Sequence, residues 1–516
     1  MDIKVNREEI SAAEVIFDDT QEQSAELDYV LPDYYPEIFR ILKCIASPSI
    51  LSYSINGDRL TYELCVCVRV LYCSEDSSAV QSISQKLNYT KTADLGRTPS
   101  DPRVSISAKT DYMNCRAVNQ RRLDVRGAVS IKIRVSDLDT KEIVCDAFGG
   151  GIQLKKIPVT YPANKLYATK RVNVTEEFDL GLSKPPITSI LRSDAVVASS
   201  DKKIIANKLI AKGEVYINML YSCVKDGNDC AEAMQFTLPF SQIIDMDGID
   251  DRYNCTVRAE VVSCDIEPRS DGDGNSKVAE CSLGILISCS AYRTANAELA
   301  VDEYSTAYKT QSEKSAVRIE LPPQPINTSA VVKGALDHGE GGIDRIYDVW
   351  CTVSGVTSCP DTENGQLSIS GNADYTVMAR DSEGVPIMLE KEEPFTVSVP
   401  VEGITETSSA NIKLVPVSCS YNLASDSGVE AKAELRITGD IENNMTINGI
   451  TDIVVDEEEP INRSGNYALK LYFTDENEDL WEIAKKYGTS VSAIMEENEI
   501  EDDTVSGTGM ILIPIV

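Results

Sequence analysis

"LIAKGEVYINMLY" occupies residues 209–221, and an apolar residue or a glycine stands at every second position of it. Alternation with a period of two is typical of an antiparallel strand that turns one face to a core and the other to water. Gly213 falls on the apolar face, where a residue without a side chain usually marks a bulge or a bend. The stretch therefore predicts a long, bent strand.

Five further stretches repeat this pattern. They are LDVRGAVSIKIRV (123–135), LSISGNADYTVMA (367–379), LRITGDI (435–441), LTYELCVCVRVLY (60–72) and CSLGILISCSAY (281–292). Gly127, Gly371 and Gly439 stand in phase in the first three, whereas Leu64 and Ile285 take that place in the others. We expect the glycines to occupy equivalent bends, and two copies of the strand to build one double-layered β unit.

A larger repeat has the size of a domain. LPDYYPEIFRILK, LGLSKPPITSILR and LPPQPINTSAVVK begin at Leu31, Leu180 and Leu321, about 140 to 150 residues apart, which is a usual domain length. The predicted fold is mainly β, with three tandem antiparallel, sandwich-like units before a small α/β module. The expected boundaries are 1–28 for an N-terminal extension, 29–165, 166–312 and 313–459 for the units, and 460–516 for the module.

Two details of the units are further expectations. A proline at the first turn predicts a short helix within residues 34–44. Residues 166–178 and 306–318 are polar, and two interpretations stay open for them: linkers between units, or strands exchanged between units.

The C-terminal module is predicted from residues 478–500, EDLWEIAKKYGTSVSAIMEENEI. Asp479 suits the N-cap of a helix that begins at Leu480, Gly488 suits a left-handed stop, and Ser490 suits the cap of a second helix. Strand-like runs at 469–473 and 510–513 flank these helices. The order is therefore strand, helix, helix, strand.

The charge and the residue types exclude several functions. The formal net charge of -33 disfavours nucleic acid and anionic membranes as partners. His338 is the single histidine, so a multi-histidine metal site is impossible and a histidine-dependent nucleophile has one candidate. There is no phosphate-binding loop motif, and residues 270–277 are interpreted as an acidic hairpin loop and not as a calcium site. We expect no enzymatic activity, no cofactor and no metal.

The start of the chain and its cysteines indicate a compartment. Residues 1–19 lack the apolar stretch of a secretory signal, and no apolar run reaches the roughly 18 residues of a membrane span. We expect a cytoplasmic protein with no transmembrane anchor. Its 15 cysteines are then reduced, buried side chains, with later cross-linking left open.

The repeats resemble a known family. Residues 31–50, the strand that ends in VRVLY, and TLPFSQII at 237–244 resemble the SPOCS domain of spore-forming Firmicutes. Residues 471–500 followed by MILIPI resemble a LysM module. Together they are similar to SipL-like spore coat morphogenetic proteins. The resemblance implies a non-enzymatic scaffold in the mother cell, which sits at the forespore surface and connects the spore coat to a basement-layer ATPase and other coat proteins.

The loops of the module predict the ligand. Sugar-binding LysM modules carry Gly-Asp-Thr where this chain has Asn477, Glu478 and Asp479, and the glycine lets the backbone approach a sugar. Acidic loops favour a basic protein surface instead. The candidate binding residues are Asn477, Glu478, Asp479, Trp481, Asn498, Glu499 and Asp502. Trp481 is the candidate apolar anchor, and two interpretations stay open for its side chain: structural packing, which is favoured, and a half-exposed position. Two alternatives stay open: a peptidoglycan- or chitin-binding wall protein, and a LysM-bearing wall hydrolase.

Overall fold

The computed structural model describes residues 3–74, 79–225, 227–270, 276–339, 342–424, 427–461, 468–475, 478–502, 504 and 508–515. Antiparallel strands make up nearly all of it, and two short helices lie near the C-terminal end. The predicted fold class, mainly β with a small α/β module at the end, is confirmed.

The first set of strands forms two three-stranded sheets. Its members are β1 (Lys4–Val30), β2 (Arg40–Asn56), β3 (Arg59–Cys73), β4 (Val80–Asp94), β5 (Arg103–Asn119) and β6 (Arg122–Phe148). The sheet orders are β1-β6-β5 and β2-β3-β4, so the alternating strands β6 and β3 are central in each sheet. Their inward side chains, among them Val66 and Val129, are fully buried in one core between the sheets. The period of two in the sequence therefore reflects a sandwich.

The second set repeats this arrangement. It consists of β7 (Ile152–Asp179), β8 (Ser189–Ile205), β9 (Lys208–Lys225), β10 (Asn228–Asp245), β11 (Asn254–Arg269) and β12 (Val278–Ser305). The sheet orders are β11-β12-β7 and β10-β9-β8. The stretch at 209–221 lies in β9, the central strand of its sheet, and its alternate residues Leu209, Val215 and Ile217 are buried.

The third set follows the same plan, but each of its two long strands is divided into two. It consists of β13 (Tyr308–Glu320), β14 (Gln324–Asp337), β15 (Ile343–Asp361), β16 (Gln366–Asp381), β17 (Pro386–Pro400), β18 (Ser409–Leu423), β19 (Gly428–Glu442) and β20 (Asn444–Pro460). The sheet orders are β14-β19-β18 and β15-β16-β17, and β13 pairs with β20. Pro322 and Pro323 separate β13 from β14 because proline cannot donate to a sheet ladder.

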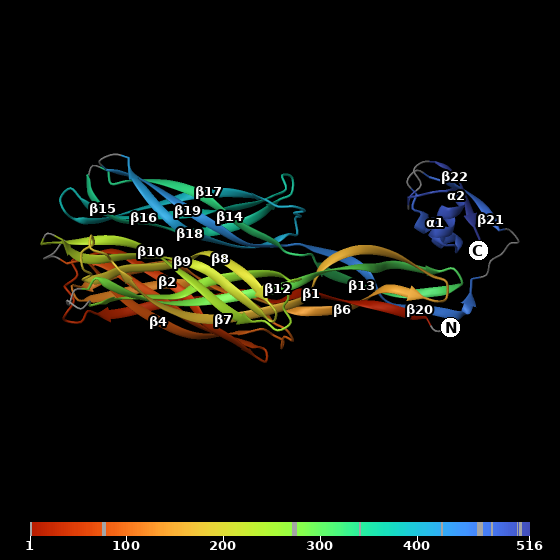
Figure 1. Cartoon of the computed structure of the whole chain (residues 1–516), viewed down its shortest axis with the longest axis horizontal. Coiled ribbons are helices and arrows are strands. Elements are labelled where there is room, and N and C mark those ends of the chain that lie inside the picture. Colours follow the sequence, from red (N-terminus) through yellow and green to blue (C-terminus); the bar gives the residue numbers. More distant parts are fainter. Residues whose placement is uncertain are drawn as a thin grey trace.

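The strand sets share a narrow extension, here called the stalk. It comprises residues 4–15 of β1 with 136–148 of β6, residues 152–163 of β7 with 293–305 of β12, and β13 with β20. Side chains from each of these ribbons, such as Ile143, Leu299 and Ile319, pack into one core. Figure 1 shows the sandwiches gathered at one end of an elongated molecule and the stalk running from them to the C-terminal module.

The sandwiches also meet around a shared apolar cluster. Leu71 of β3, Leu220 of β9 and Met378 of β16 occupy the central strands of three different sheets and contribute to this one cluster. Tyr347 and Trp350 of β15 complete much of it. The three sandwiches therefore pack against one another and form one unit, here called the head, instead of a linear array of separate domains.

Two sequence expectations can now be compared with the strands. The short helix expected within 34–44 is wrong: residues 33–35 form a turn and β2 begins at Arg40. The Tyr72 hydroxyl donates to the carbonyl oxygen of Pro36, and the Ile38 amide donates to that of Gln120, so tertiary contacts hold this loop open. The polar stretches 166–178 and 306–318 lie mainly within β7 and β13 and are strands, not linkers.

The domain boundaries remain predictions. β7 and β13 both continue across the expected boundaries at 165/166 and 312/313, and each pairs with the last strand of its own set. We therefore propose to divide the chain at 149–151 and 306–307, between β6 and β7 and between β12 and β13.

The in-phase glycines are equivalent in three copies and not in the fourth. Gly127, Gly213 and Gly371 each lie four residues after the first buried leucine of a central strand. The register irregularity near each of them belongs to the neighbouring edge strand, and the glycine strand continues through it. Gly439 instead lies near the end of β19, because Leu435 is well inside that strand. The expectation for Gly439 is therefore wrong.

Gly127→Ala is expected to lower the free energy of unfolding by about 1–3 kcal/mol. A Cβ atom at Gly127 would lie 2.4 Å from the carbonyl oxygen of Tyr112, so the neighbouring backbone has to move. Gly509→Ala is the matched control, because nothing lies within 4 Å of a Cβ atom there. Chemical denaturation followed by far-UV circular dichroism measures both variants, and equal midpoints would contradict the prediction.

Candidate functional site

The C-terminal module has the predicted order of elements. It consists of β21 (Leu469–Thr474), α1 (Leu480–Tyr487), α2 (Val491–Asn498) and β22 (Gly509–Pro514), and β21 pairs antiparallel with β22. Leu480, Ile483, Ile494, Ile511 and Ile513 bury a small core between the helices and one face of this sheet.

The helix ends are fixed by the residues that the sequence indicated. Asp479 Oδ1 accepts a 2.9 Å hydrogen bond from the backbone amide of Trp481, and Ser490 Oγ accepts one of 3.1 Å from that of Ala493. Gly488 ends α1 with a φ of 65°, a left-handed conformation that glycine adopts without strain. The predicted caps of both helices are confirmed.

Trp481 lies in a contact between the module and the stalk. Its indole Nε1 donates a 2.8 Å hydrogen bond to Asp302 Oδ2 of β12, and its ring meets that of Tyr304 edge-on at 4.8 Å. The residue is only 7% exposed. The structure confirms the packed interpretation, and the half-exposed one is wrong, because a partner 179 positions earlier in the chain covers the indole.

Polar contacts surround this tryptophan. Lys485 Nζ lies 2.6 Å from Asp302 Oδ2, and Lys155 Nζ of β7 lies 2.5 Å from Asp479 Oδ2. The Tyr304 hydroxyl donates a 2.6 Å hydrogen bond to the carbonyl oxygen of Thr489. These contacts join α1 and the turn after it to the tip of the stalk.

The electrostatics of Asp302 favour the docked arrangement at neutral pH. Burial alone would raise the pKa of this carboxyl, but Lys314, Lys485 and the Trp481 indole outweigh it and hold the pKa well below its usual range. A carboxylate with a lowered pKa stabilises the contact fully above its unfolded-state pKa of about 3.9, and loses that contribution as the pH falls below it.

The module is therefore expected to stay docked from about pH 8 to pH 5 and to be released progressively below about pH 4. The fluorescence of Trp481 in a Trp350→Phe variant reports this, since the chain has two tryptophans. Asp302→Asn should remove most of the pH dependence in this range. Release near pH 6.5 would contradict the assignment to Asp302.

The other predicted site residues fall into distinct environments. Glu478 Oε1 accepts a 2.6 Å hydrogen bond from the Tyr472 hydroxyl and raises the pKa of that tyrosine to about 12. Asn498 ties α2 to β22, because its amide exchanges two 2.6 Å hydrogen bonds with the backbone of Leu512. Glu499 and Asp502 are exposed. Asn477 lies outside the described residues.

The structure brings the two candidate loops together. An isolated antiparallel bridge joins Asp479, before α1, to Thr504, after α2. Glu478 and Asp479 therefore share one end of the module with the loop that carries Glu499 and Asp502. The side chain of Asp479 is already engaged by Lys155, and that of Asn498 by the backbone.

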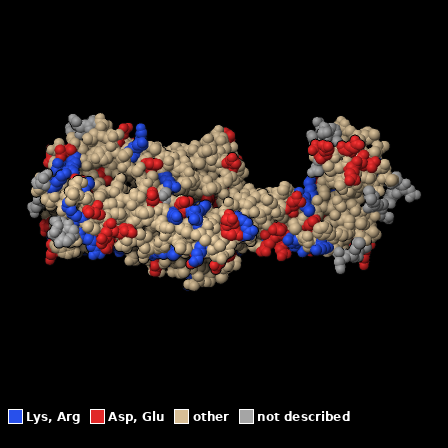
Figure 2. All heavy atoms as spheres, viewed as in Figure 1, with Lys and Arg blue, Asp and Glu red and all other residues tan. Residues whose placement is uncertain are grey.

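The surface of the module is acidic. Figure 2 shows carboxylates gathered on the side of the module that faces the viewer. The exposed acids at the end of α2 and beyond it are Glu496, Glu497, Glu499, Glu501 and Asp502. Among the basic side chains, Lys485 pairs with Asp302, and Lys470 and Lys486 lie over the ring of Tyr487 at 4.3 and 5.5 Å. Among the described residues of the module, none of these exposed acids forms a salt bridge with a lysine or an arginine.

One feature of the module was missed from the sequence. Leu469, Leu471, Phe473 and Met510 are exposed on the face of the β21–β22 sheet that is turned away from the helices. The sequence did indicate it: in LKLYF at 469–473 and MILIP at 510–514, apolar residues stand at neighbouring positions and not only at every second one. Such strands have two apolar faces.

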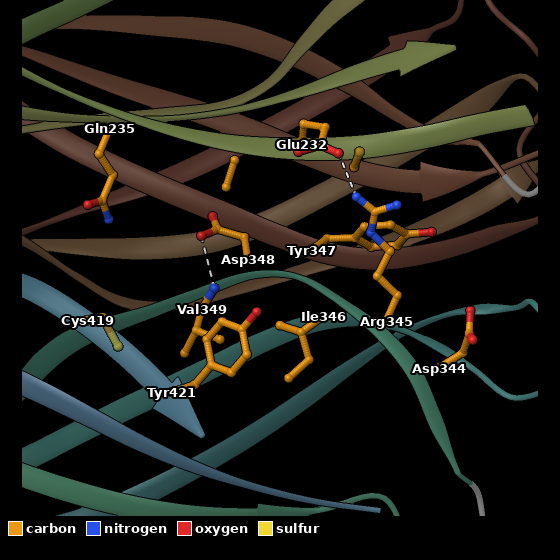
Figure 3. Close-up of a pocket in the computed structure, with 12 residues that line it drawn as sticks. Glu232, Gln235, Asp344, Arg345, Ile346, Tyr347, Asp348, Val349, Cys419 and Tyr421 are labelled. Atoms are coloured by element: carbon orange, nitrogen blue, oxygen red, sulfur yellow. Dashed lines mark hydrogen bonds and ion pairs between the residues drawn. The ribbon is translucent and has the colours of Figure 1, made fainter. Parts of the chain in front are cut away.

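A cleft in the head offers a second candidate site. It has a volume of about 570 Å³ and lies between β10, β15 and β18, with Glu232, Arg345, Asp348, Cys419 and Tyr421 in its lining (Figure 3). Its charged groups neutralise one another: Arg345 lies 2.6 Å from Glu232, and Asp348 lies 2.6 Å from Arg192.

The thiol that lines this cleft is not an activated nucleophile. Burial raises the pKa of the Cys419 thiol to about 12, so it is protonated at neutral pH and a poor nucleophile. Across the described ranges, no group of three or more His, Cys, Asp or Glu side chains could hold a metal ion. Within the same ranges, no helix has the length and apolarity to cross a membrane.

Comparison with protein families gives two matches. The model described as SipL, SPOCS domain, matches residues 186–268, which span β8 to β11, and the LysM domain model matches residues 476–506, which include α1 and α2. No curated protein and no solved structure matches the chain. The resemblance inferred from the sequence, a SipL-like protein with a SPOCS domain and a LysM domain, is confirmed. Both are non-catalytic domains, and together they fit a sporulation- or coat-associated protein.

Proposed function

We propose that this SipL-like chain is a non-enzymatic scaffold of the spore coat, and that its LysM module docks on a protein of the coat basement layer. The observation that carries this proposal is the position and charge of the module. It sits at the end of the stalk away from the head (Figure 1), and within its described residues the exposed acids form no salt bridge with a basic side chain. A basement-layer ATPase at the forespore surface, facing the mother-cell cytoplasm, is the expected partner, with other coat proteins bound elsewhere.

A protein ligand suits the module better than a glycan. The loop before α1 reads Asn477, Glu478 and Asp479 where sugar-binding modules carry Gly-Asp-Thr, so the glycine that lets the backbone approach a sugar is missing. Lys155 of the stalk also holds the Asp479 side chain. Neutral sugars gain little from an acidic field, whereas a basic protein surface gains faster encounter and specificity. Glycan binding stays the second candidate, because the LysM match favours it. The wall-hydrolase alternative has no support among the described side chains.

The test is recruitment to the forespore. A chain without residues 462–516, fused to a fluorescent protein, should remain in the mother-cell cytoplasm, whereas the full chain should surround the forespore. The truncated chain keeps every strand of the head and the stalk, so circular dichroism of the purified variant serves as the folding control.

Titration of the full chain with chitin and peptidoglycan oligomers separates the two candidates. We expect no binding in the low micromolar range. Tight glycan binding together with unchanged recruitment of the truncated chain would refute the docking function.

A further inference from the structure

The outer face of the β21–β22 sheet is apolar and uncovered. Leu469, Leu471 and Phe473 alternate along β21, Phe473 lies directly opposite Met510, and Leu471 lies opposite Leu512. Leu471 is 56% exposed, Phe473 76% and Met510 58%. The inner positions Ile511 and Ile513 are buried beneath the helices. A sheet that packs on one side normally carries polar residues on the other. This contiguous patch is here called the apolar sheet face, and exposed patches of this kind mark interaction sites.

The stalk does not use this face. The described contacts between the module and the stalk come from Asp479 at the start of α1, from Trp481 and Lys485 within it, and from Thr489 in the turn after it. These groups belong to the helical side of the module, whereas Leu471 and Phe473 point from the opposite side of the sheet. Within the part of the chain that the structure describes, this face therefore stays uncovered while the module is docked.

We propose that the apolar sheet face binds an amphipathic helix of a partner protein that carries basic residues beside its apolar stripe. This deepens the docking function proposed above and rests on it. Phe473 is the central anchor, since a large exposed aromatic side chain gains most from being covered. Leu471 and Met510 flank it in the same plane.

The charge of the module selects this occupant. Glu496, Glu497, Glu499 and Glu501 are exposed on the same small module. A second copy of the chain would bring the same surplus of negative charge against itself, and an anionic membrane surface would be repelled. A glycan lacks the apolar surface that this face would cover. A segment with lysines or arginines beside its apolar residues would complement both the apolar sheet face and the acidic surface of the module.

The experiment measures binding of a labelled amphipathic peptide of leucine and lysine to the full chain by fluorescence anisotropy. The variant is Leu471→Gln with Phe473→Gln, which leaves the net charge unchanged. The control is Leu182→Gln, at an exposed leucine in the head. A peptide in which glutamate replaces lysine tests the charge requirement. We expect at least a tenfold weaker binding for the double variant, unchanged binding for the control, and no binding of the acidic peptide.

Other outcomes overturn the proposal. Equal affinity of the double variant shows that the face is not the binding surface. Loss of a dimer in the double variant by analytical ultracentrifugation assigns the face to a second copy. Binding of the full chain to phosphatidylglycerol vesicles that the double variant loses assigns it to a membrane. Recruitment separates this proposal from the docking function: if the truncated chain fails to reach the forespore and the double variant reaches it, docking holds and this face is not its surface.

Discussion

Replacing Arg192 with methionine is expected to lower the free energy of unfolding of the head by about 3–5 kcal/mol, because the substitution leaves Asp348 buried without its partner. Arg192 Nη1 lies 2.6 Å from Asp348 Oδ2, and both side chains are largely shielded from water. The guanidinium also lies over the ring of Trp350 at 4.2 Å. The pair joins β8 to β15, so its loss weakens the contact between two sandwiches.

The pH dependence of this variant has a definite sign. Burial raises the pKa of Asp348 even with Arg192 beside it, and removing the arginine raises that pKa further. A carboxyl whose pKa is raised by folding favours the folded state only when it is protonated, and this contribution is lost as the pH rises through the folded-state value. The deficit of Arg192→Met should therefore be smaller at pH 5 than at pH 8.

Chemical denaturation at both pH values measures these effects. Arg192→Met combined with Asp348→Leu should recover much of the loss, since an apolar pair of similar size leaves no charge buried. Lys309→Met is the control, because its partner Glu459 is well exposed and such surface pairs contribute at most about 1 kcal/mol. If Arg192→Met costs no more than Lys309→Met, the buried pair does not hold the head together.

The fold class could be predicted because its signal is local. Alternate residues such as Leu209, Val215 and Ile217 identify a half-buried strand from a window of thirteen positions. The caps at Asp479 and Ser490 could be predicted for the same reason, since each bonds within three residues of itself. Gly439 was wrongly equated with the other three glycines, because a short sequence motif does not show whether it lies at the beginning or the end of a strand.

The long-range contacts could not be predicted. Arg192 and Asp348 are 156 positions apart, and Trp481 and Asp302 are 179 apart, and nothing in a single sequence marks such pairs. The stalk could not be predicted, because its residues in β1, such as Ile10, resemble an N-terminal extension in the sequence. Their role becomes clear only when their partners in β6 and β13 are placed beside them. The residues that cover Trp481 could not be predicted for the same reason, since Asp302 and Tyr304 belong to a distant part of the chain.

Trp481→Ala is expected to release the module from the stalk and to lower the stability of the module by about 3–5 kcal/mol, as large-to-small changes of buried aromatic residues do. The substitution removes the edge-on contact with Tyr304 and the hydrogen bond to Asp302 together. Trp481→Phe keeps a ring against Tyr304 and loses only the N–H donor, so we expect an intermediate cost of about 1.5–3 kcal/mol, as for other hydrogen bonds to charged groups.

The module's position is measured by single-molecule energy transfer between dyes on an exposed stalk residue and on the module. Trp481→Ala should broaden the distance distribution and make the module more susceptible to limited proteolysis. Phe473→Ala is the matched control, because that ring is exposed on the other side of the module, and it should change neither readout. A narrow, unchanged distribution for Trp481→Ala would show that other contacts hold the module. If the distribution broadens and recruitment weakens in parallel, the stalk fixes the direction in which the module presents its free face, which is what a scaffold that bridges two layers requires.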